Sequence, residues 1–195
     1  MIGLERRAAM ATLLADRGDD LVAIPGLGST CWDLAAAGDN DRNFYLWGAM
    51  GGAAMVGLGL ALAQPERRVL VVTGDGEMLM GMGALATIGI KKPANLAIVV
   101  FDNGHYGETG MQPSHTNRGG VDLVAIAEGC GFEAVMDVRD EAGLAALAAR
   151  LKALSGNGPL FARLAIQTGE APRVLPERDG VVLKNRFRAA IGLNA

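Results

Sequence analysis

Two short apolar segments, each followed by a turn that carries a polar side chain, constrain the fold of this chain more than any other feature. Residues 69–73 form a run of strand-forming residues that leads into Gly74-Asp75-Gly76, and residues 95–101 form a second run that leads to Asn103. Asn103 follows Asp75 by 28 positions, which leaves room for one helix between two strands. The spacing predicts two parallel strands, with Asp75 and Asn103 at the same edge of a sheet.

This pair of side chains suits a particular kind of ligand. A carboxylate and an amide oxygen at the carboxyl ends of neighbouring strands are typical ligands of a hard cation such as Mg²⁺ or Ca²⁺ that carries a diphosphate. A Gly-flanked aspartate by itself is a weak motif, because it is common in structural turns between a strand and a helix. Its position one strand-helix-strand unit before Asn103 makes it specific, and predicts a metal and diphosphate site.

Strand and helix patterns alternate along the rest of the chain. Strands are expected at residues 21–24, 43–47, 69–73, 95–101, 134–138 and 160–166. Helices are expected at residues 4–15, 31–37 and 50–63, after Gly76, and at residues 121–128, 141–154 and 183–191. The alternation predicts the α/β class, with a doubly wound, mostly parallel sheet and helices on both faces.

Composition sets limits on the organisation and the partners of the chain. Its 195 residues fit one domain of ordinary size, which we place at residues 1–170, with residues 171–195 as an extension that docks on this domain or on a partner. A net charge of −3 without a basic run argues against a nucleic-acid partner. Residues 50–63 are too few to span a bilayer, and no apolar stretch follows the arginines of residues 1–10. We expect a cytoplasmic protein without membrane contact.

Three segments resemble the diphosphate-binding half of thiamine diphosphate-dependent 2-oxo acid decarboxylases. They are residues 48–62, 74–116 and 122–132, so the resemblance covers most of the chain. Within this family the chain is most similar to the beta subunits of sulfopyruvate decarboxylases and the matching half of phosphonopyruvate decarboxylases. The resemblance implies the thiamine diphosphate-binding fold, the cofactors thiamine diphosphate and Mg²⁺, and decarboxylation of a small anionic 2-oxo acid.

The resemblance also implies ligands for the metal and the diphosphate. Asp75 and Asn103 would bind Mg²⁺ through their side chains, and His105 through its backbone carbonyl. Backbone N–H groups of Gly76 and Glu77 would meet the diphosphate at the start of a helix, where the helix dipole favours negative charge. The other residues that it implies in the cofactor site are Ser29 and Thr30, which add hydroxyl groups, and Gly74, Tyr106 and Gly107.

Residues 48–51 correspond to a turn that shapes the bound cofactor in this family. Met50 matches a hydrophobic wedge beneath the thiazolium ring, and the Gly48 carbonyl would hold the aminopyrimidine. Taken alone, residues 48–62 are more typical of a Gly- and Ala-rich packing helix, and their pairing with the Gly74-Asp75-Gly76 motif reverses that preference.

The loop after Tyr106 lies where the two decarboxylases have their substrate-side segment. His115 is a candidate proton donor or anion contact, and the alternative interpretation is a solvated loop histidine. Glu108 stands where the family has a small residue, and its carboxylate would repel an anionic substrate. This departure leaves the sulfonate or phosphonate assignment open.

The family's activating glutamate lies on a separate pyrimidine-binding domain, for which this sequence has no room. We therefore expect a hetero-oligomer in which an alpha subunit supplies that glutamate. Two alternatives remain open: a carboligase or synthase subunit with the same cofactor, and a non-catalytic scaffold. A nucleotide-binding domain is disfavoured because no GxGxxG motif or P-loop follows the first strand.

Overall fold

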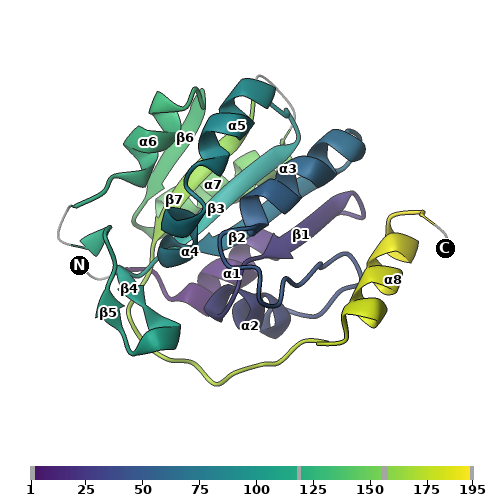
Figure 1. Ribbon diagram of the computed structural model, residues 1–195, viewed down its shortest axis with the longest axis horizontal. Coiled ribbons are helices and arrows are strands. Elements are labelled where there is room, and N and C mark those ends of the chain that lie inside the picture. The colour runs from purple at the N-terminus through teal and green to yellow at the C-terminus, as the bar shows by residue number, and fades with distance from the viewer. Residues whose placement is uncertain (1–2, 118–119, 155–157, 194–195) are drawn as a thin grey trace.

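The computed structural model describes residues 3–117, 120–154 and 158–193, and its centre is a five-stranded parallel sheet (Figure 1). The strands lie in the order β1-β2-β3-β7-β6. Their bounds are β1 (Leu21–Pro25), β2 (Arg68–Gly74), β3 (Leu96–Asp102), β6 (Ala134–Val138) and β7 (Leu160–Ala165). The predicted α/β class and parallel sheet are confirmed.

Alternate residues of the central strands face opposite layers of helices. In β2, Leu70 and Val72 belong to the core that also contains α1 (Arg6–Leu14), α2 (Ser29–Ala36) and α7 (Glu141–Lys152). Val69 and Val71 face the other core, which contains α3 (Ala53–Ala63), α5 (Ala84–Lys91) and α6 (Leu123–Gly129). Strands that are buried on both faces explain the uninterrupted apolar runs of the sequence. In the described part of the chain, no helix is long and apolar enough to cross a membrane.

One predicted strand is wrong, and the helices on either side of it, α2 and α3, begin at other positions than expected. Residues 43–47 form no strand, and only an isolated bridge joins Asn43 to Ala23. Helix α2 begins at Ser29 instead of residue 31, which shortens the connection after the first strand, whereas α3 begins at Ala53 instead of residue 50. The delay has a cause in the backbone, because Gly51 has φ +84°, a conformation outside the right-handed helix.

The helix expected after Gly76 is divided in two, and the segment after Asn103 contains elements that the sequence pattern did not indicate. Helix α4 (Asp75–Met80) is short and ends before α5 begins. After β3 the chain forms a small antiparallel hairpin of β4 (His105–Tyr106) and β5 (Gln112–Pro113), with a 3-10 turn at Gly107–Thr109 between them. This hairpin lies at the carboxyl edge of the sheet, beside α4 (Figure 1).

The C-terminal segment runs along the same edge before it ends in a helix. Figure 1 shows it in yellow-green, passing from β7 below the hairpin to α8 (Gly180–Ala190) on the β1 side. Phe187 of α8 packs against Phe44 with ring centroids 5.2 Å apart and ring planes inclined by 52°, and Arg186 forms an ion pair with Asp39 at 2.8 Å. The segment thus contacts this domain, while the boundary at residue 170 stays a prediction.

Candidate functional site

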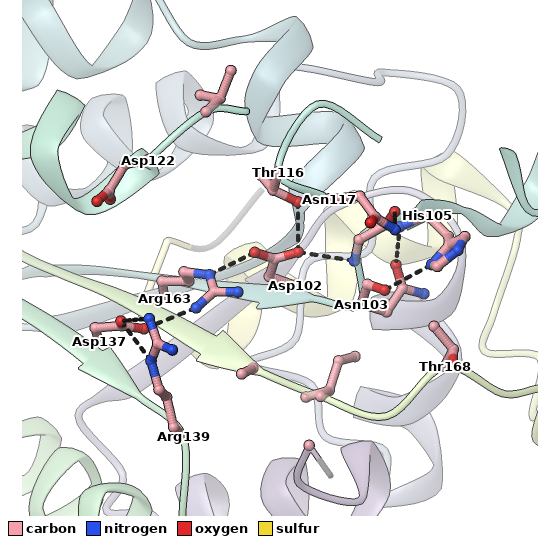
Figure 2. A pocket seen from close by; sticks show the side chains of 15 residues that line it. Asp102, Asn103, His105, Thr116, Asn117, Asp122, Asp137, Arg139, Arg163 and Thr168 are labelled. Atoms are coloured by element: carbon pink, nitrogen blue, oxygen red, sulfur yellow. Dashed lines mark hydrogen bonds and ion pairs between the residues drawn. The ribbon is translucent and has the colours of Figure 1, made fainter. Parts of the chain in front are cut away.

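Two neighbouring cavities open at the carboxyl edge of the sheet. The smaller one, the Asp75 cavity, has a volume of about 210 Å³. The larger one, the Arg163 cavity, has a volume of about 680 Å³ and polar walls (Figure 2). Asn103, His105 and Ile166 contribute to both walls.

The Asp75 cavity brings together every predicted cofactor-binding residue except Gly48. These wall residues are Ser29, Thr30, Met50, Gly74, Asp75, Gly76, Glu77, Asn103, His105, Tyr106 and Gly107.

Strand register places Asp75 beside a second carboxylate. Gly74 of β2 pairs with Phe101 of β3, so Asp75 comes opposite Asp102, and both side chains are buried. Ser114 donates a hydrogen bond to Oδ2 of Asp75, and the Thr116 hydroxyl lies 3.2 Å from that oxygen and 2.8 Å from Oδ1 of Asp102. A hydroxyl has one hydrogen, so Thr116 satisfies only one of the two carboxylates at a time.

The pKa of Asp75 reflects this crowded setting. Burial, together with the negative charge of Asp102, raises the pKa to about 6, although the hydrogen bonds from Ser114 and Thr116 act in the opposite direction. A divalent cation at this position would favour the carboxylate form, because its charge outweighs these effects.

Asp102 is held away from Asp75 by partners of its own. Its Oδ2 forms an ion pair of 2.6 Å with Nε of Arg163, and its Oδ1 accepts the N–H of Gly104 at 2.9 Å. Arg163 also forms an ion pair with Asp137, 3.0 Å from Nη1 to Oδ1, which a dashed line marks in Figure 2. The negative charge of Asp102 is therefore compensated on the side of the Arg163 cavity, and Asp75 is the carboxylate available to the smaller cavity.

Asn103 follows β3 and lines the cavity, and its side-chain oxygen can still bind a ligand. Its Oδ1 accepts the N–H of His105 at 2.8 Å, and its backbone oxygen lies 2.8 Å from Nδ1 of the His105 ring (Figure 2). An amide oxygen has two lone pairs, so one hydrogen bond leaves the second lone pair for a metal. The ring of His105 is directed to Asn103, which fits a role for His105 that does not need its imidazole.

Glu77 has a side-chain role that sequence reasoning missed. Its carboxylate accepts hydrogen bonds from the N–H of Leu27 at 3.1 Å, the N–H of Gly51 at 3.2 Å and the hydroxyl of Thr73 at 2.8 Å. Burial raises the pKa of Glu77 in spite of these donors. The side chain thus ties the loop before α2 and the turn before α3 to the end of β2.

This contact explains why residue 26 is a glycine. A Cβ atom on Gly26 would lie 1.6 Å from Oε2 of Glu77, which no side chain permits. The sequence shows the glycine and the glutamate 51 positions apart, and only the tertiary structure shows that they touch.

Ser29 and Thr30 are the first two residues of α2, not loop residues as expected. Thr30 donates its hydroxyl hydrogen to the carbonyl of Gly26 at 3.0 Å. Ser29 is half-buried, and its hydroxyl has no hydrogen bond within the described residues. Of the two, Ser29 is the available donor for a ligand in the cavity.

The turn that contains Gly48 and Met50 is exposed to solvent. Met50 lines the Asp75 cavity and is 41% exposed. Gly48 has φ +75°, is exposed, and has no atom within 4 Å of the position of a Cβ. The cavity therefore lacks a cover on the side where the family's wedge residue is expected.

The hairpin loop brings Glu108 to the cavity wall but not His115. His115 is exposed and lines neither cavity, and its Nδ1 lies 3.2 Å from the hydroxyl of Tyr106. Glu108 has a cation nearby, since Nη2 of Arg173 lies 3.9 Å from its carboxylate. Residues 118–119 of this loop lie outside the described residues.

Arg6 and Asp33 also line the Asp75 cavity, and sequence reasoning missed both. Asp33 is buried in α2, and Nε of Arg6 lies 3.1 Å from its Oδ2. The one available signal was Asp33 itself, a charged residue within the otherwise apolar sequence of α2, because a buried charge needs a partner of opposite charge.

Comparisons with known proteins agree with this geometry. Residues 27–163 match the C-terminal TPP binding domain of thiamine pyrophosphate enzymes. A phosphonopyruvate decarboxylase from Streptomyces viridochromogenes is 40% identical over 191 residues, which are 95% of this chain but 46% of the relative. The chain therefore spans about half the length of that protein.

A relative of similar length supports the same assignment, and a solved structure shows the same fold. Sulfopyruvate decarboxylase subunit beta from Methanothermobacter thermautotrophicus is 38% identical over 184 residues, 94% of either chain. The thiamine diphosphate-dependent 4-hydroxybenzoylformate decarboxylase from Rhodococcus jostii RHA1 has the same fold, with a TM-score of 0.70 and 20% identity over 88% of this chain and 34% of that one. This chain belongs to the thiamine pyrophosphate enzyme family and corresponds to its C-terminal TPP binding domain.

Proposed function

We propose that this chain is the beta subunit of a heteromeric, Mg²⁺-dependent decarboxylase that uses thiamine diphosphate and acts on a small 2-oxo acid. The observation that carries the proposal is the position of Asp75 and Asn103. They come from neighbouring strands, line one cavity, and offer carboxylate and amide oxygens, the donor set that Mg²⁺ prefers.

Each group of residues in and beside the cavity has a role in this proposal. Asp75, Asn103 and the His105 carbonyl hold the metal, and backbone N–H groups at the start of α4, with the Ser29 hydroxyl, bind the diphosphate. Met50 supports the thiazolium ring, and Gly48 orients the aminopyrimidine. When bound, thiamine diphosphate supplies the carbon nucleophile and the electron sink that decarboxylation needs.

The size and openness of the cavity support a partner subunit. About 210 Å³ is less than the roughly 300 Å³ at the lower end of pockets that enclose a whole small ligand. The cavity thus suits the diphosphate end, and a partner would cover the rest and supply the activating glutamate. The relatives fit this division, because one is named a beta subunit and another is about twice as long.

The proposed substrate is a 2-oxo acid with a second anionic group, such as 3-sulfopyruvate or 3-phosphonopyruvate. Arg173 beside Glu108 reduces the repulsion that this carboxylate would exert on such a substrate. His115 remains a proposed proton donor, and because it lies outside the cavity, this role requires movement of the loop or contact with the partner.

The test is product analysis with this chain alone, with its partner, and with the Asp75→Ala variant. We expect carbon dioxide and an aldehyde from a 2-oxo acid only when the wild-type chain and the partner are combined. Full activity of the isolated chain would contradict the heteromer. Products that appear only after an acceptor aldehyde is added would instead identify a carboligase.

A further inference from the structure

The charges around the Asp75 cavity are unbalanced for a ligand that is itself an anion. Its wall contains the carboxylates of Asp33, Asp75, Glu77 and Glu108, whereas Arg6 is the one Arg or Lys among its described wall residues. A diphosphate that enters this cavity needs positive charge, and one metal ion at Asp75 compensates only part of the negative charge. The position of Arg6 is therefore decisive.

Arg6 is the first residue of α1, and two of its nitrogens are anchored. The residue is 7% exposed, with Nε 3.1 Å from Oδ2 of Asp33 and Nη1 3.4 Å from the carbonyl of Gly169. Its Nη2 has no hydrogen bond within the described residues. Because a guanidinium is planar and stays charged, these contacts orient the remaining N–H groups of a buried cation that lines the cavity.

Arg7 offers a natural comparison. Its Nε lies 3.2 Å from Oδ1 of the same Asp33, but its side chain is 26% exposed and it donates to the carbonyl of Pro172. Arg7 does not line the cavity. Two arginines on one carboxylate leave a formal charge of +1 for the group, so Asp33 does not cancel the charge of Arg6.

We propose that Arg6 is an anion-binding residue of this cavity and contacts the diphosphate of the cofactor through Nη2. The inference rests on the proposed function, because it needs thiamine diphosphate to bind here. In this arrangement Arg7 compensates the charge of Asp33, and Asp33 fixes the guanidinium of Arg6. The chain thereby adds a charged side chain to the backbone and hydroxyl donors of the diphosphate site.

The experiment measures binding rather than activity. Thiamine diphosphate and, separately, inorganic pyrophosphate are titrated with Mg²⁺ into the assembled protein by calorimetry, for the wild type, Arg6→Gln and the matched control Arg7→Gln. We expect Arg6→Gln to raise the dissociation constants of both ligands by about tenfold to a hundredfold, which is the effect of losing a hydrogen bond from a charged group. Arg7→Gln should weaken the binding of both ligands clearly less than Arg6→Gln does, because Arg7 does not line the cavity and acts only through the charge of Asp33.

A conservative variant and an unfolding measurement separate binding from structure. Arg6→Lys keeps the charge but not the planar fork, so it should recover part of the affinity that Arg6→Gln loses. Thermal unfolding of the ligand-free variants shows whether either change alters the fold. Partial recovery in Arg6→Lys supports a charge contact even if Arg6→Gln is less stable.

Four results would overturn the proposal. Equal losses in Arg6→Gln and Arg7→Gln would mean that both arginines act only by stabilising Asp33. Unchanged pyrophosphate binding together with a raised KM for the 2-oxo acid would show that Arg6 binds the substrate's own anionic group. If the wild type bound neither ligand, the proposed function would fail as well. Equal binding by the wild type and Arg6→Gln would instead refute the role of Arg6 and leave the proposed function intact.

Discussion

A single methyl group on Gly26 should disrupt the contact that joins the loops around the cavity. The added Cβ would lie 1.6 Å from Oε2 and 2.5 Å from Cδ of Glu77, so the carboxylate has to move. It would then lose its hydrogen bonds with the N–H groups of Leu27 and Gly51 and with the hydroxyl of Thr73. Gly26→Ala therefore perturbs three chain segments at once.

The size of this effect follows from the hydrogen bonds involved. A hydrogen bond to a charged group contributes roughly 1.5–3 kcal/mol, and disruption of a buried charged network costs about 3–5 kcal/mol. We expect Gly26→Ala to lower the free energy of unfolding by about 3–5 kcal/mol, measured by urea denaturation with the midpoint and the slope fitted separately.

The matched control is Gly59→Ala. Gly59 is an exposed residue of α3, and a Cβ there meets no atom within 4 Å. This variant should be unchanged or more stable by about 0.5–1 kcal/mol, because alanine favours a helix. If Gly26→Ala lies within about 1 kcal/mol of the wild type, the role assigned to the Glu77 carboxylate is refuted.

Three further predictions concern packing and charge. Arg163→Met should lower the free energy of unfolding by about 3–5 kcal/mol in urea, because it leaves the buried Asp102 carboxylate without its ion pair; an unchanged midpoint would contradict this. Gly57→Ala should cost about 1–3 kcal/mol, since its Cβ would lie 2.2 Å from Cγ2 of Val71, and a cost as small as that of Gly59→Ala would refute the close packing of α3 on β2. Burial raises the pKa of Asp39, but hydrogen bonds from Arg186 and Tyr45 outweigh this and hold the pKa below its usual 3.8. The stability that this ionised carboxylate adds is therefore complete above pH 3.8 and is lost as the pH falls through the lowered pKa. The difference in the free energy of unfolding between the wild type and Asp39→Asn should be present at pH 7 and shrink in acid. A difference that grows in acid would contradict the direction of the pKa shift.

The elements that surround the cavity differ in how well the sequence predicts them. The runs that became β2 and β3 were found because strands buried on both faces have uninterrupted apolar patterns. Residues 43–47 are also rich in residues that favour strands, here aromatic ones, but they form no strand. There, polar contacts fix the chain: Asn43 donates to the hydroxyl of Tyr45 at 3.0 Å, and Arg17 donates to Asn43 at 2.6 Å. Such contacts override the strand propensity of the residues.

The residues of the candidate site also differ in whether a local sequence pattern indicates them. Asp75 and Asn103 could be predicted because each directly follows a strand of one strand-helix-strand unit. The roles of Arg6, Asp33 and the Glu77 carboxylate depend on contacts between residues 26 to 50 positions apart, for which one sequence gives no local signal. Local patterns thus indicated the proposed metal ligands, whereas the residues that orient the cavity walls required the tertiary structure.

The central claim is that this chain holds the diphosphate and the metal while a partner completes the cofactor site. Calorimetric titration of thiamine diphosphate with Mg²⁺ into the chain, alone and with its partner, tests this claim most directly, with Asp75→Ala as the variant. We predict tight binding that needs the partner, disappears when Mg²⁺ is chelated, and is lost in Asp75→Ala. Absence of binding in every combination, or binding that Asp75→Ala leaves unchanged, would contradict the account.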